Sequence, residues 1–361
     1  MSKRSASRRG ARDARTPSSV IPAGRCAQGF ARRARLAASG VVVALCACGA
    51  PLREAEFTID SPPVRLGATL YAPDASAPVP AVLLLHGSGP DGRSNPYYRE
   101  LAGAFGRRGI AALVYDKRGS GASTGDWREV PFTALLDDAE AVLRSLKRHP
   151  WIDSSRVGIW GGSEGATLAP LLAARVEGVA FVIVQSMSGV PFAEQYLHQA
   201  AREFAGSPQD SADVVALVRA KLAYLRDRSQ WSRYDSLAQA SSGRRIAAYA
   251  TPRTTDSWWW RWYATKMEVS AVPTLAALRV PTLAVWGAAD VLVPVDTSRA
   301  AVLAARASLR QPGDRVLLID GASHSVQIPG IRGLLAGAGL RNRPVHLREM
   351  TDWAATQTRR R

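Results

Sequence analysis

The clearest candidate for a reactive side chain is Ser163, which stands between two glycines in the segment "WGGSEGA" at residues 160–166. An apolar run precedes this segment, and a stretch of helical spacing follows it. Glycine on either side of a serine allows a sharp turn from a strand into a helix, which leaves the hydroxyl exposed at the edge of a sheet. We therefore interpret Ser163 as a nucleophile, with an ordinary glycine-rich turn as the alternative.

The base that would activate Ser163 is expected at His324. A serine hydroxyl is a weak nucleophile until a base, usually a histidine oriented by a carboxylate, removes its proton. His324 lies in "DGASHSV", directly after the last strand that we expect, where a loop could bring its ring to Ser163. The other histidines are expected in a loop after a strand, at a helix end, in a helical insertion and in a loop beyond the last strand; in that order they are His86, His149, His198 and His346.

The carboxylate of this set is expected at Asp290. It lies in "VWGAADVLVP", on the loop after the seventh expected strand, and loops after parallel strands are where active sites collect. Asp320 and Asp314 are rival carboxylates, but the first still lies within the last strand and the second precedes it. The chain order Ser163, Asp290, His324 is one of the orders in which a serine triad occurs.

Attack by a serine places negative charge on the carbonyl oxygen of the substrate, so the site also needs fixed hydrogen-bond donors. The amide of Glu164 follows Ser163 at the start of a helix and supplies one donor. We assign the second donor to the amide of Ser88 in "HGSGP", where the glycines let the backbone point inward. A simple turn at the end of a strand is the alternative for this loop. We expect the Glu164 side chain to point into the surroundings of its helix, so only its amide is given a role.

The elements that would position these residues form a regular alternation from position 55 onward. Short apolar runs alternate with longer segments of helical spacing, which favours a mostly parallel sheet covered by helices. Runs such as Val82 to Leu85 are apolar at consecutive positions, as a strand buried on both faces requires. We expect eight strands, at 55–60, 64–71, 81–86, 110–116, 156–160, 179–185, 281–286 and 315–320. We expect core helices at 97–108, 133–148, 165–176 and 297–309.

The stretch 191–275 breaks this alternation, because it contains charged helical pieces and no strand signal. We interpret it as a helical cap inserted between strands six and seven of a core formed by 49–190 and 276–361. The cap contains the aromatic run "SWWWRWYATKM". Packing of the cap onto the core is the favoured explanation of this run, because aromatic side chains usually fill cores. The sharper hypothesis is that Trp260 and Trp262 wall a substrate pocket.

Five short motifs occur in order along these elements: "HGSGP", "DKRGSGAS" at 116–123, the segment around Ser163, "GAAD" and "GASH". In these motifs the segment from about 80 to 325 resembles the α/β-hydrolase superfamily. Within that superfamily it is most similar to bacterial carboxylesterases of the esterase D type, whose "HGSGP" and "YDKRG" blocks it reproduces. The resemblance implies a Ser-Asp-His hydrolase that acts through an acyl-enzyme, with no metal or organic cofactor.

The motifs are less specific for the substrate, because related sequences include peptidases and thioesterases. We predict a hydrolase of small-molecule carboxylic esters, with a serine peptidase or acyl thioesterase of the same fold as the alternative. A lipoprotein of the same fold that binds a ligand without catalysis is the remaining hypothesis. Asp116 and Arg118 of the second motif are interpreted as structural, as an ion pair and hydrogen-bond brace near the oxyanion loop.

The net charge of +17 is concentrated at the amino terminus and does not indicate a nucleic-acid partner. Residues 1–48 carry ten lysines and arginines against one acid, and the remaining positive charge is spread along the chain. A basic stretch followed by the apolar run "LAASGVVVALCAC" is too short for an ordinary membrane span and has the length of a signal sequence. We therefore expect 1–48 to be a disordered basic extension and an export signal.

The end of this signal, Leu45-Cys46-Ala47-Cys48, resembles the processing box of bacterial lipoproteins, in which the cysteine after a small residue receives the lipid. We therefore expect Cys48 to be lipidated and the protein to be held on a membrane facing the periplasm. A plain cleaved signal, which gives a periplasmic or secreted protein, is the alternative. All three cysteines lie in this segment, so the expected fold contains no disulfide. The sequence does not predict an oligomeric state.

Overall fold

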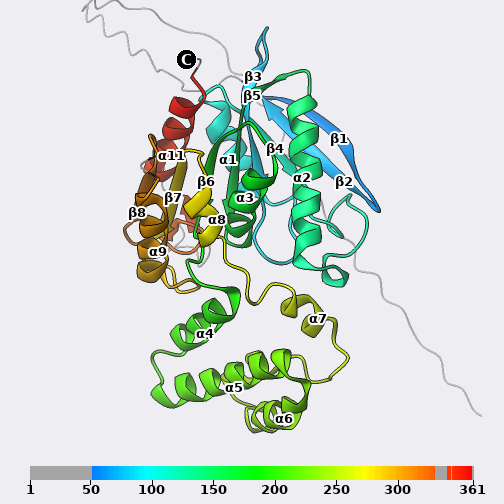
Figure 1. Ribbon diagram of the computed structural model, residues 1–361, viewed down its shortest axis with the longest axis vertical. Coiled ribbons are helices and arrows are strands. Elements are labelled where there is room, and N and C mark those ends of the chain that lie inside the picture. Colours follow the sequence, from blue (N-terminus) through cyan, green and yellow to red (C-terminus); the bar gives the residue numbers. More distant parts are fainter. Residues whose placement is uncertain (1–50, 310, 330–339, 343, 360–361) are drawn as a thin grey trace, which may run out of the picture. The chain divides into compact units, whose positions relative to one another are not determined.

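The computed structural model describes residues 51–309, 311–329, 340–342 and 344–359, which belong to one compact unit (Figure 1). The expected signal segment 1–48, including Cys48, lies outside the described residues. None of the helices in the described part of the chain is long and apolar enough to cross a membrane.

An eight-stranded sheet forms the centre of the unit, in the order β1-β2-β4-β3-β5-β6-β7-β8. It is parallel from β4 to β8, while β1 and β2 run antiparallel to their neighbours. The predicted mostly parallel sheet of eight strands is therefore confirmed. The strands are β1 (Arg53–Ser61), β2 (Val64–Ala72), β3 (Val79–Leu85), β4 (Ala111–Tyr115), β5 (Ile152–Gly162), β6 (Val179–Gln185), β7 (Thr282–Gly287) and β8 (Arg315–Ile319).

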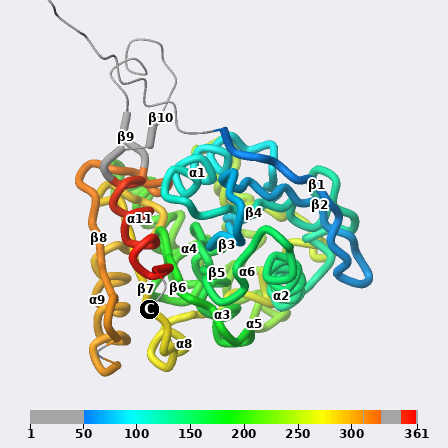
Figure 2. Tube along the Cα trace, turned by 90° about the horizontal axis from the view of Figure 1, so that it is seen from above, coloured from blue at the N-terminus to red at the C-terminus, as the bar shows by residue number. Residues whose placement is uncertain are grey.

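Helices cover both faces of this sheet, as Figure 2 shows from above. One face is covered by α1 (Pro96–Gly106) and α11 (Pro344–Gln357), and the other by α2 (Phe132–Arg148), α3 (Glu164–Arg175), α8 (Val272–Ala277) and α9 (Val295–Ala307). Strand β3 shows why its apolar residues are consecutive: Val82 and Leu84 pack under α1, whereas Leu83 and Leu85 pack under α2 and α3. Because alternate side chains of a strand point to opposite faces, both sets are buried.

The predicted cap follows β6 and consists of helices. It contains α4 (Phe192–Glu203), α5 (Pro208–Arg226), α6 (Trp231–Ala240) and α7 (Trp258–Ala264), with short 3₁₀ turns at Arg228–Gln230 and Arg245–Ala250. These helices lie beyond the carboxyl end of β6, below the sheet in Figure 1. The cap therefore stands at the edge of the sheet where the strand-end loops collect.

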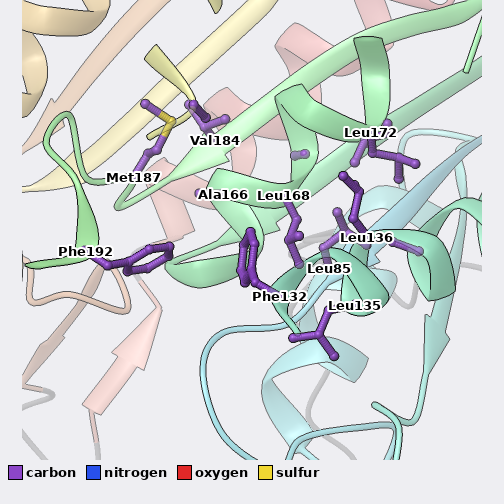
Figure 3. Close-up of a cluster of buried hydrophobic side chains, with 14 of the residues drawn as sticks. Leu85, Phe132, Leu135, Leu136, Ala166, Leu168, Leu172, Val184, Met187 and Phe192 are labelled. Atoms are coloured by element: carbon purple, nitrogen blue, oxygen red, sulfur yellow. The ribbon is translucent and has the colours of Figure 1, made fainter. Parts of the chain in front are cut away.

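The hydrophobic core continues from the sheet into the cap. Figure 3 shows Phe192 at the start of α4 and Phe132 at the start of α2, with Ala166 and Leu168 of α3 near them. The rings of Phe132 and Phe192 meet edge to face, with their centroids 5.8 Å apart. The backbone amide of Phe132 also donates a hydrogen bond of 3.0 Å to Oγ1 of Thr265 in the cap. These contacts hold the insertion onto the start of α2.

The carboxyl-terminal part contains elements that the sequence analysis did not predict. They are α11 and a small antiparallel pair, β9 (Gln327–Pro329) and β10 (Leu340–Asn342). His346 was expected in a loop, but it lies in α11 and its side chain is buried. Leu347, Met350, Trp353 and Ala354 of α11 are buried on the sheet. Their spacing of three and four residues is that of a helix, so the sequence carried a signal for α11 that the prediction did not use.

Candidate active site

Ser163 stands at a strained turn between β5 and α3. Its φ and ψ angles are 55° and −115°, a backbone conformation that costs a residue with a side chain on the order of 1–3 kcal/mol. Glycine is needed on both sides: a Cβ on Gly161 would lie 2.0 Å from the carbonyl oxygen of Gly165, and a Cβ on Gly165 would lie 2.4 Å from that of Leu85. The Ser163 side chain makes no capping bond to α3. The predicted strand-turn-helix setting is therefore present.

His324 and Asp290 are brought together from two different loops. Asp290 follows β7, His324 follows β8, and His324 Nδ1 lies 2.7 Å from Asp290 Oδ2. The other oxygen of the carboxylate accepts hydrogen bonds from the amides of Leu292 and Val293, at 2.8 and 3.3 Å. The loop of His324 is held in turn by Ser186, whose hydroxyl donates to the His324 carbonyl at 2.6 Å.

Ser163 and His324 line one cavity of about 640 Å³ at the carboxyl edge of the sheet. The Asp290 pair occupies Nδ1 of the His324 ring, so Nε2 is the nitrogen left to accept a proton. The cavity brings together the strand-end loops and the start of α1; its described lining is Gly87, Ser88, Asp91, Asn95, Pro96, Tyr97, Tyr98, Glu100, Gly162, Ser163, Gln185, Leu292, His324 and Ser325. Within the described part of the chain, no group of three or more His, Cys, Asp or Glu is placed to hold a metal ion.

The two residues predicted to offer oxyanion donors, Ser88 and Glu164, are linked by their side chains. Ser88 Oγ donates a hydrogen bond of 3.1 Å to Glu164 Oε2. Both residues adjoin Ser163: Glu164 follows it in the chain, and Ser88 lines the same cavity. The assignment of their backbone amides to an oxyanion remains a prediction.

The Glu164 carboxylate is buried between two lysines. Lys117 Nζ lies 3.2 Å from Oε1, and Lys266 Nζ lies 2.6 Å from Oε2. Burial by itself would raise the pKa of Glu164, but the ammonium groups of Lys266 and Lys117 outweigh it and lower the pKa to about 2. Lys117 also donates to the carbonyl of Gly87, next to Ser88. Glu164 is therefore a carboxylate at neutral pH and ties the loop of Gly87 and Ser88 to the start of α3.

Sequence reasoning missed Lys117, Lys266 and the polar pair Tyr97 and Gln185 on the cavity wall. Gln185 Nε2 donates to the Tyr97 hydroxyl at 2.7 Å, and burial raises the pKa of Tyr97 above its ordinary value. Lys117 carries a signal, because it belongs to the "DKRGSGAS" motif. Lys266 carries none, because its carboxylate partner is 102 positions away.

Trp260 and Trp262 lie in the packing of the cap and are absent from the cavity lining among the described residues. Trp260 is 1% exposed, and its ring meets those of Tyr224 and Tyr234 edge to face. The Trp262 ring lies against the ammonium of Lys266, 3.8 Å from its centroid. This placement favours packing over a substrate-binding role, because neither ring faces the space beside Ser163.

The rival acids have other surroundings. Asp314 forms a salt bridge of 2.8 Å with Arg306, and Asp320 is exposed. Among the rival histidines, burial lowers the pKa of His198 although the nearby Asp290 charge acts in the opposite direction, whereas His86 is held elsewhere. Burial and the nearby Lys117 charge lower the pKa of His86 to about 4, and its Nε2 is bonded to the Tyr115 carbonyl. In the described structure, Asp314, Asp320 and His86 therefore do not replace a member of the candidate triad.

The expected brace at Asp116 and Arg118 is present, but the two residues do not pair with each other. Asp116 pairs with Arg93, whose NH2 lies 2.9 Å from Oδ2. Arg118 pairs with Asp138 of α2, at 2.8 Å. The expectation that Asp116 and Arg118 pair with each other was wrong, because each meets a partner from another part of the chain.

One family covers most of the chain. Residues 60–325 match the pattern of the family described as X-Pro dipeptidyl-peptidase (S15 family). The chain belongs to this family. Among curated relatives of this S15 member, esterase FrsA of Salmonella paratyphi B is 36% identical over 123 residues, which is 34% of this chain and 28% of that protein. The chain therefore spans little more than a quarter of the length of this relative.

Solved structures agree on the architecture of this S15 family member. DcsB in complex with its substrate analogue matches with a TM-score of 0.55 at 18% identity, over 85% of this chain and 99% of that one. An esterase from Pyrococcus furiosus matches with 0.53 at 16% identity, over 85% and 89%. Proline iminopeptidase of Mycobacterium smegmatis matches with 0.51 at 16% identity, over 84% and 99%. The fold is the α/β-hydrolase fold, and the predicted superfamily is confirmed.

Proposed function

We propose that the chain is a serine hydrolase that cleaves carboxylic esters through an acyl-enzyme formed on Ser163. The observation that carries this proposal is the 2.7 Å hydrogen bond between His324 Nδ1 and Asp290 Oδ2, made by a histidine that lines the same cavity as Ser163. The strained backbone of Ser163 supports it, because strain at a residue with a side chain persists where the surrounding structure requires that conformation.

In the proposed reaction, Ser163 Oγ attacks the carbonyl carbon of the ester while Nε2 of His324 takes the hydroxyl proton. Asp290 holds the ring and stabilises the imidazolium. The amides of Ser88 and Glu164 receive the oxyanion. The carbon–oxygen bond to the alcohol then breaks, and His324 returns the proton to the departing alcohol. A water molecule next gives a proton to His324 and attacks the acyl carbon, which releases the acid and restores the Ser163 hydroxyl.

Two observations favour an ester as the substrate. A curated relative is an esterase, at 36% identity over 123 residues. In addition, the described lining of the cavity contains Asp91 and Glu100 but neither lysine nor arginine. A polyphosphate carrier such as that of an acyl-coenzyme A would meet acidic groups there, so this lining favours an uncharged ester over such a thioester.

A serine peptidase is the second candidate, and the description of the matching family favours it. The same Ser163, Asp290 and His324 would serve, with an amine in place of the alcohol as leaving group. The third possibility is a binding protein without catalysis, in which Ser163 would not react.

Labelling and turnover together test the proposal. The purified full-length chain and its Ser163→Ala variant would be treated with a fluorophosphonate probe and then assayed on p-nitrophenyl esters, thioesters and peptide amides. We expect labelling and ester hydrolysis in the unchanged protein and neither in the variant, with both proteins equally folded by circular dichroism. Faster turnover of peptide amides than of esters would favour the peptidase, and absence of labelling would contradict every serine mechanism.

A further inference from the structure

The cap supplies one charged side chain to the surroundings of Ser163. Lys266 follows α7, is 2% exposed, and reaches Glu164 Oε2 at 2.6 Å. Its ammonium lies 3.8 Å from the ring centroid of Trp262 and 4.8 Å from that of Phe192. An ammonium so far from water is costly without a carboxylate partner, so the contact with Glu164 determines where the Lys266 side chain lies.

The backbone around Lys266 is fixed on both sides. The preceding residue, Thr265, accepts a hydrogen bond from the Phe132 amide of α2 at 3.0 Å. The following residue, Met267, accepts one from the Ala193 amide of α4 at 2.8 Å. Lys266 therefore approaches Glu164 from a segment that is docked on the core.

The carboxylate that Lys266 holds is connected to both candidate oxyanion donors. Glu164 bears one of the two amides itself, and its Oε2 accepts the hydroxyl of Ser88, the residue that bears the other, at 3.1 Å. Its Oε1 pairs with Lys117, which also binds the Gly87 carbonyl in the same loop. Displacement of this carboxylate would move Ser88 and the start of α3 together, because they share it.

We propose that Lys266 is a positioning residue for the hydrolysis proposed above: its ammonium fixes the Glu164 carboxylate and thereby the amides of Ser88 and Glu164 that receive the oxyanion. This inference rests on the proposed function. The insertion is then a part of the active site, since the oxyanion loop is complete only when the cap is docked. Loss of one oxyanion donor typically lowers kcat by about 10²–10³-fold, and a donor that is displaced but not removed costs less.

A comparison of two buried lysines of the cap tests this role. Lys221 is 1% exposed and donates to the Tyr196 hydroxyl at 3.1 Å and to the Thr251 carbonyl, and its ammonium lies 4.6 Å from the Trp259 ring centroid. It therefore matches Lys266 in burial and in its aromatic contact, but its described partners all lie within the cap. Lys266→Met, Lys266→Arg and Lys221→Met would be made in the full-length chain. Each would be assayed for kcat and KM on p-nitrophenyl butyrate and for the rate of fluorophosphonate labelling.

We expect Lys266→Met to lower kcat and the labelling rate by about 10- to 100-fold and to leave KM within about threefold. We expect Lys266→Arg to retain most of the kcat that Lys266→Met loses. We expect Lys221→Met to keep the kcat of the unchanged protein. A double variant, Glu164→Gln with Lys266→Met, removes the buried carboxylate together with the ammonium of Lys266, so it keeps the test valid if Lys266→Met alone unfolds. Its kcat should fall no further than that of Glu164→Gln, because the two residues act through one contact.

Equal kcat losses in Lys266→Met and Lys221→Met would overturn this inference, and so would full activity in a folded double variant. Either result, obtained with an unchanged protein that is labelled at Ser163 and hydrolyses esters, would leave the proposed function intact. An unchanged protein that is not labelled at Ser163 would overturn the proposed function and this inference with it.

Discussion

His324 Nδ1 lies 2.7 Å from Oδ2 of Asp290, and the other oxygen of that carboxylate is held by two backbone amides. Both oxygens of Asp290 are thus engaged, one by the ring and one by the loop that carries the residue itself. A carboxylate fixed in this way accepts a hydrogen bond from Nδ1–H and so favours the tautomer of His324 that carries its proton on Nδ1. Nε2 is then the ring nitrogen that takes the Ser163 proton in the proposed reaction.

The first prediction concerns this tautomer. Asp290→Asn keeps the size of the side chain but removes its charge, and its amide group can present N–H to the ring and select the wrong tautomer. We expect kcat for ester hydrolysis to fall by about 10³–10⁴-fold, with the chain still folded by circular dichroism. Asp320→Asn is the matched control, since Asp320 is exposed on the neighbouring strand-end loop, and it should leave kcat unchanged. A large loss in the Asp320 variant, or none in the Asp290 variant, would contradict the assignment.

The second prediction separates packing from substrate binding at Trp260. Its ring is enclosed by cap aromatics and its Nε1 donates to the Thr254 carbonyl at 2.7 Å. Trp260→Phe should lower the free energy of unfolding by about 1–3 kcal/mol, because it leaves that carbonyl unpaired and opens a small cavity. The order of KM values across esters of increasing acyl length should not change. A changed order of KM values with an unchanged free energy of unfolding would instead support a substrate-binding role for Trp260.

Much of the fold was predictable because its central strands are buried on both faces and therefore appear in the sequence as short apolar runs. Val82 to Leu85 alternate between two packed faces, so the run itself reveals a strand buried on both sides. The positions of Ser163, Asp290 and His324 followed from the same strands, since each residue sits just beyond a strand end. The structure places His324 in contact with Asp290 and in the cavity of Ser163.

The ionic cluster around Glu164 could not be predicted in this way. Its three members come from the start of α3, the loop after β4 and the end of the cap, and no local pattern relates them. Lys266 ends an aromatic stretch of the cap, and a single lysine in such a stretch is normally predicted to point into solvent. The expectation that Glu164 acts only through its amide overlooked the partners of its side chain, because Ser88, Lys117 and Lys266 are all distant from it in the sequence.

The third prediction concerns the amino-terminal segment, whose processing we still infer from sequence. We propose that Cys48 receives the lipid and holds the protein on a membrane. In a bacterial host with lipoprotein processing, the unchanged protein should incorporate radiolabelled palmitate and sediment with membranes, whereas Cys48→Ser should do neither. Cys46→Ser is the matched control, two positions away, and should still be labelled. Label that remains in Cys48→Ser would exclude this site of attachment.

The fourth prediction rests on His346, a fully buried histidine of α11. Neither of its ring nitrogens has a hydrogen-bond partner among the residues that the structure describes, and burial lowers its pKa to about 4. The ring is therefore neutral in the folded protein at neutral pH, with two polar atoms unpaired. Replacement by an apolar side chain of similar size removes that cost, so His346→Leu should raise the free energy of unfolding at pH 7.5 by about 1–3 kcal/mol.

The same variant should change how stability depends on pH. The folded-state pKa of His346, about 4, lies below the value of about 6.5 in an unfolded chain, so the unfolded chain binds the extra proton between these values. Titration of His346 therefore leaves the free energy of unfolding unaffected above pH 6.5 and lowers it as the pH falls toward 4, by about 3 kcal/mol in total. Urea unfolding of both proteins at pH 7.5, 6.0 and 4.5 measures this. His86 has a similarly low pKa but is unchanged in both proteins, so its effect cancels in their difference. The advantage of His346→Leu should therefore grow as the pH falls, and a constant difference would show that folding does not lower the pKa of His346.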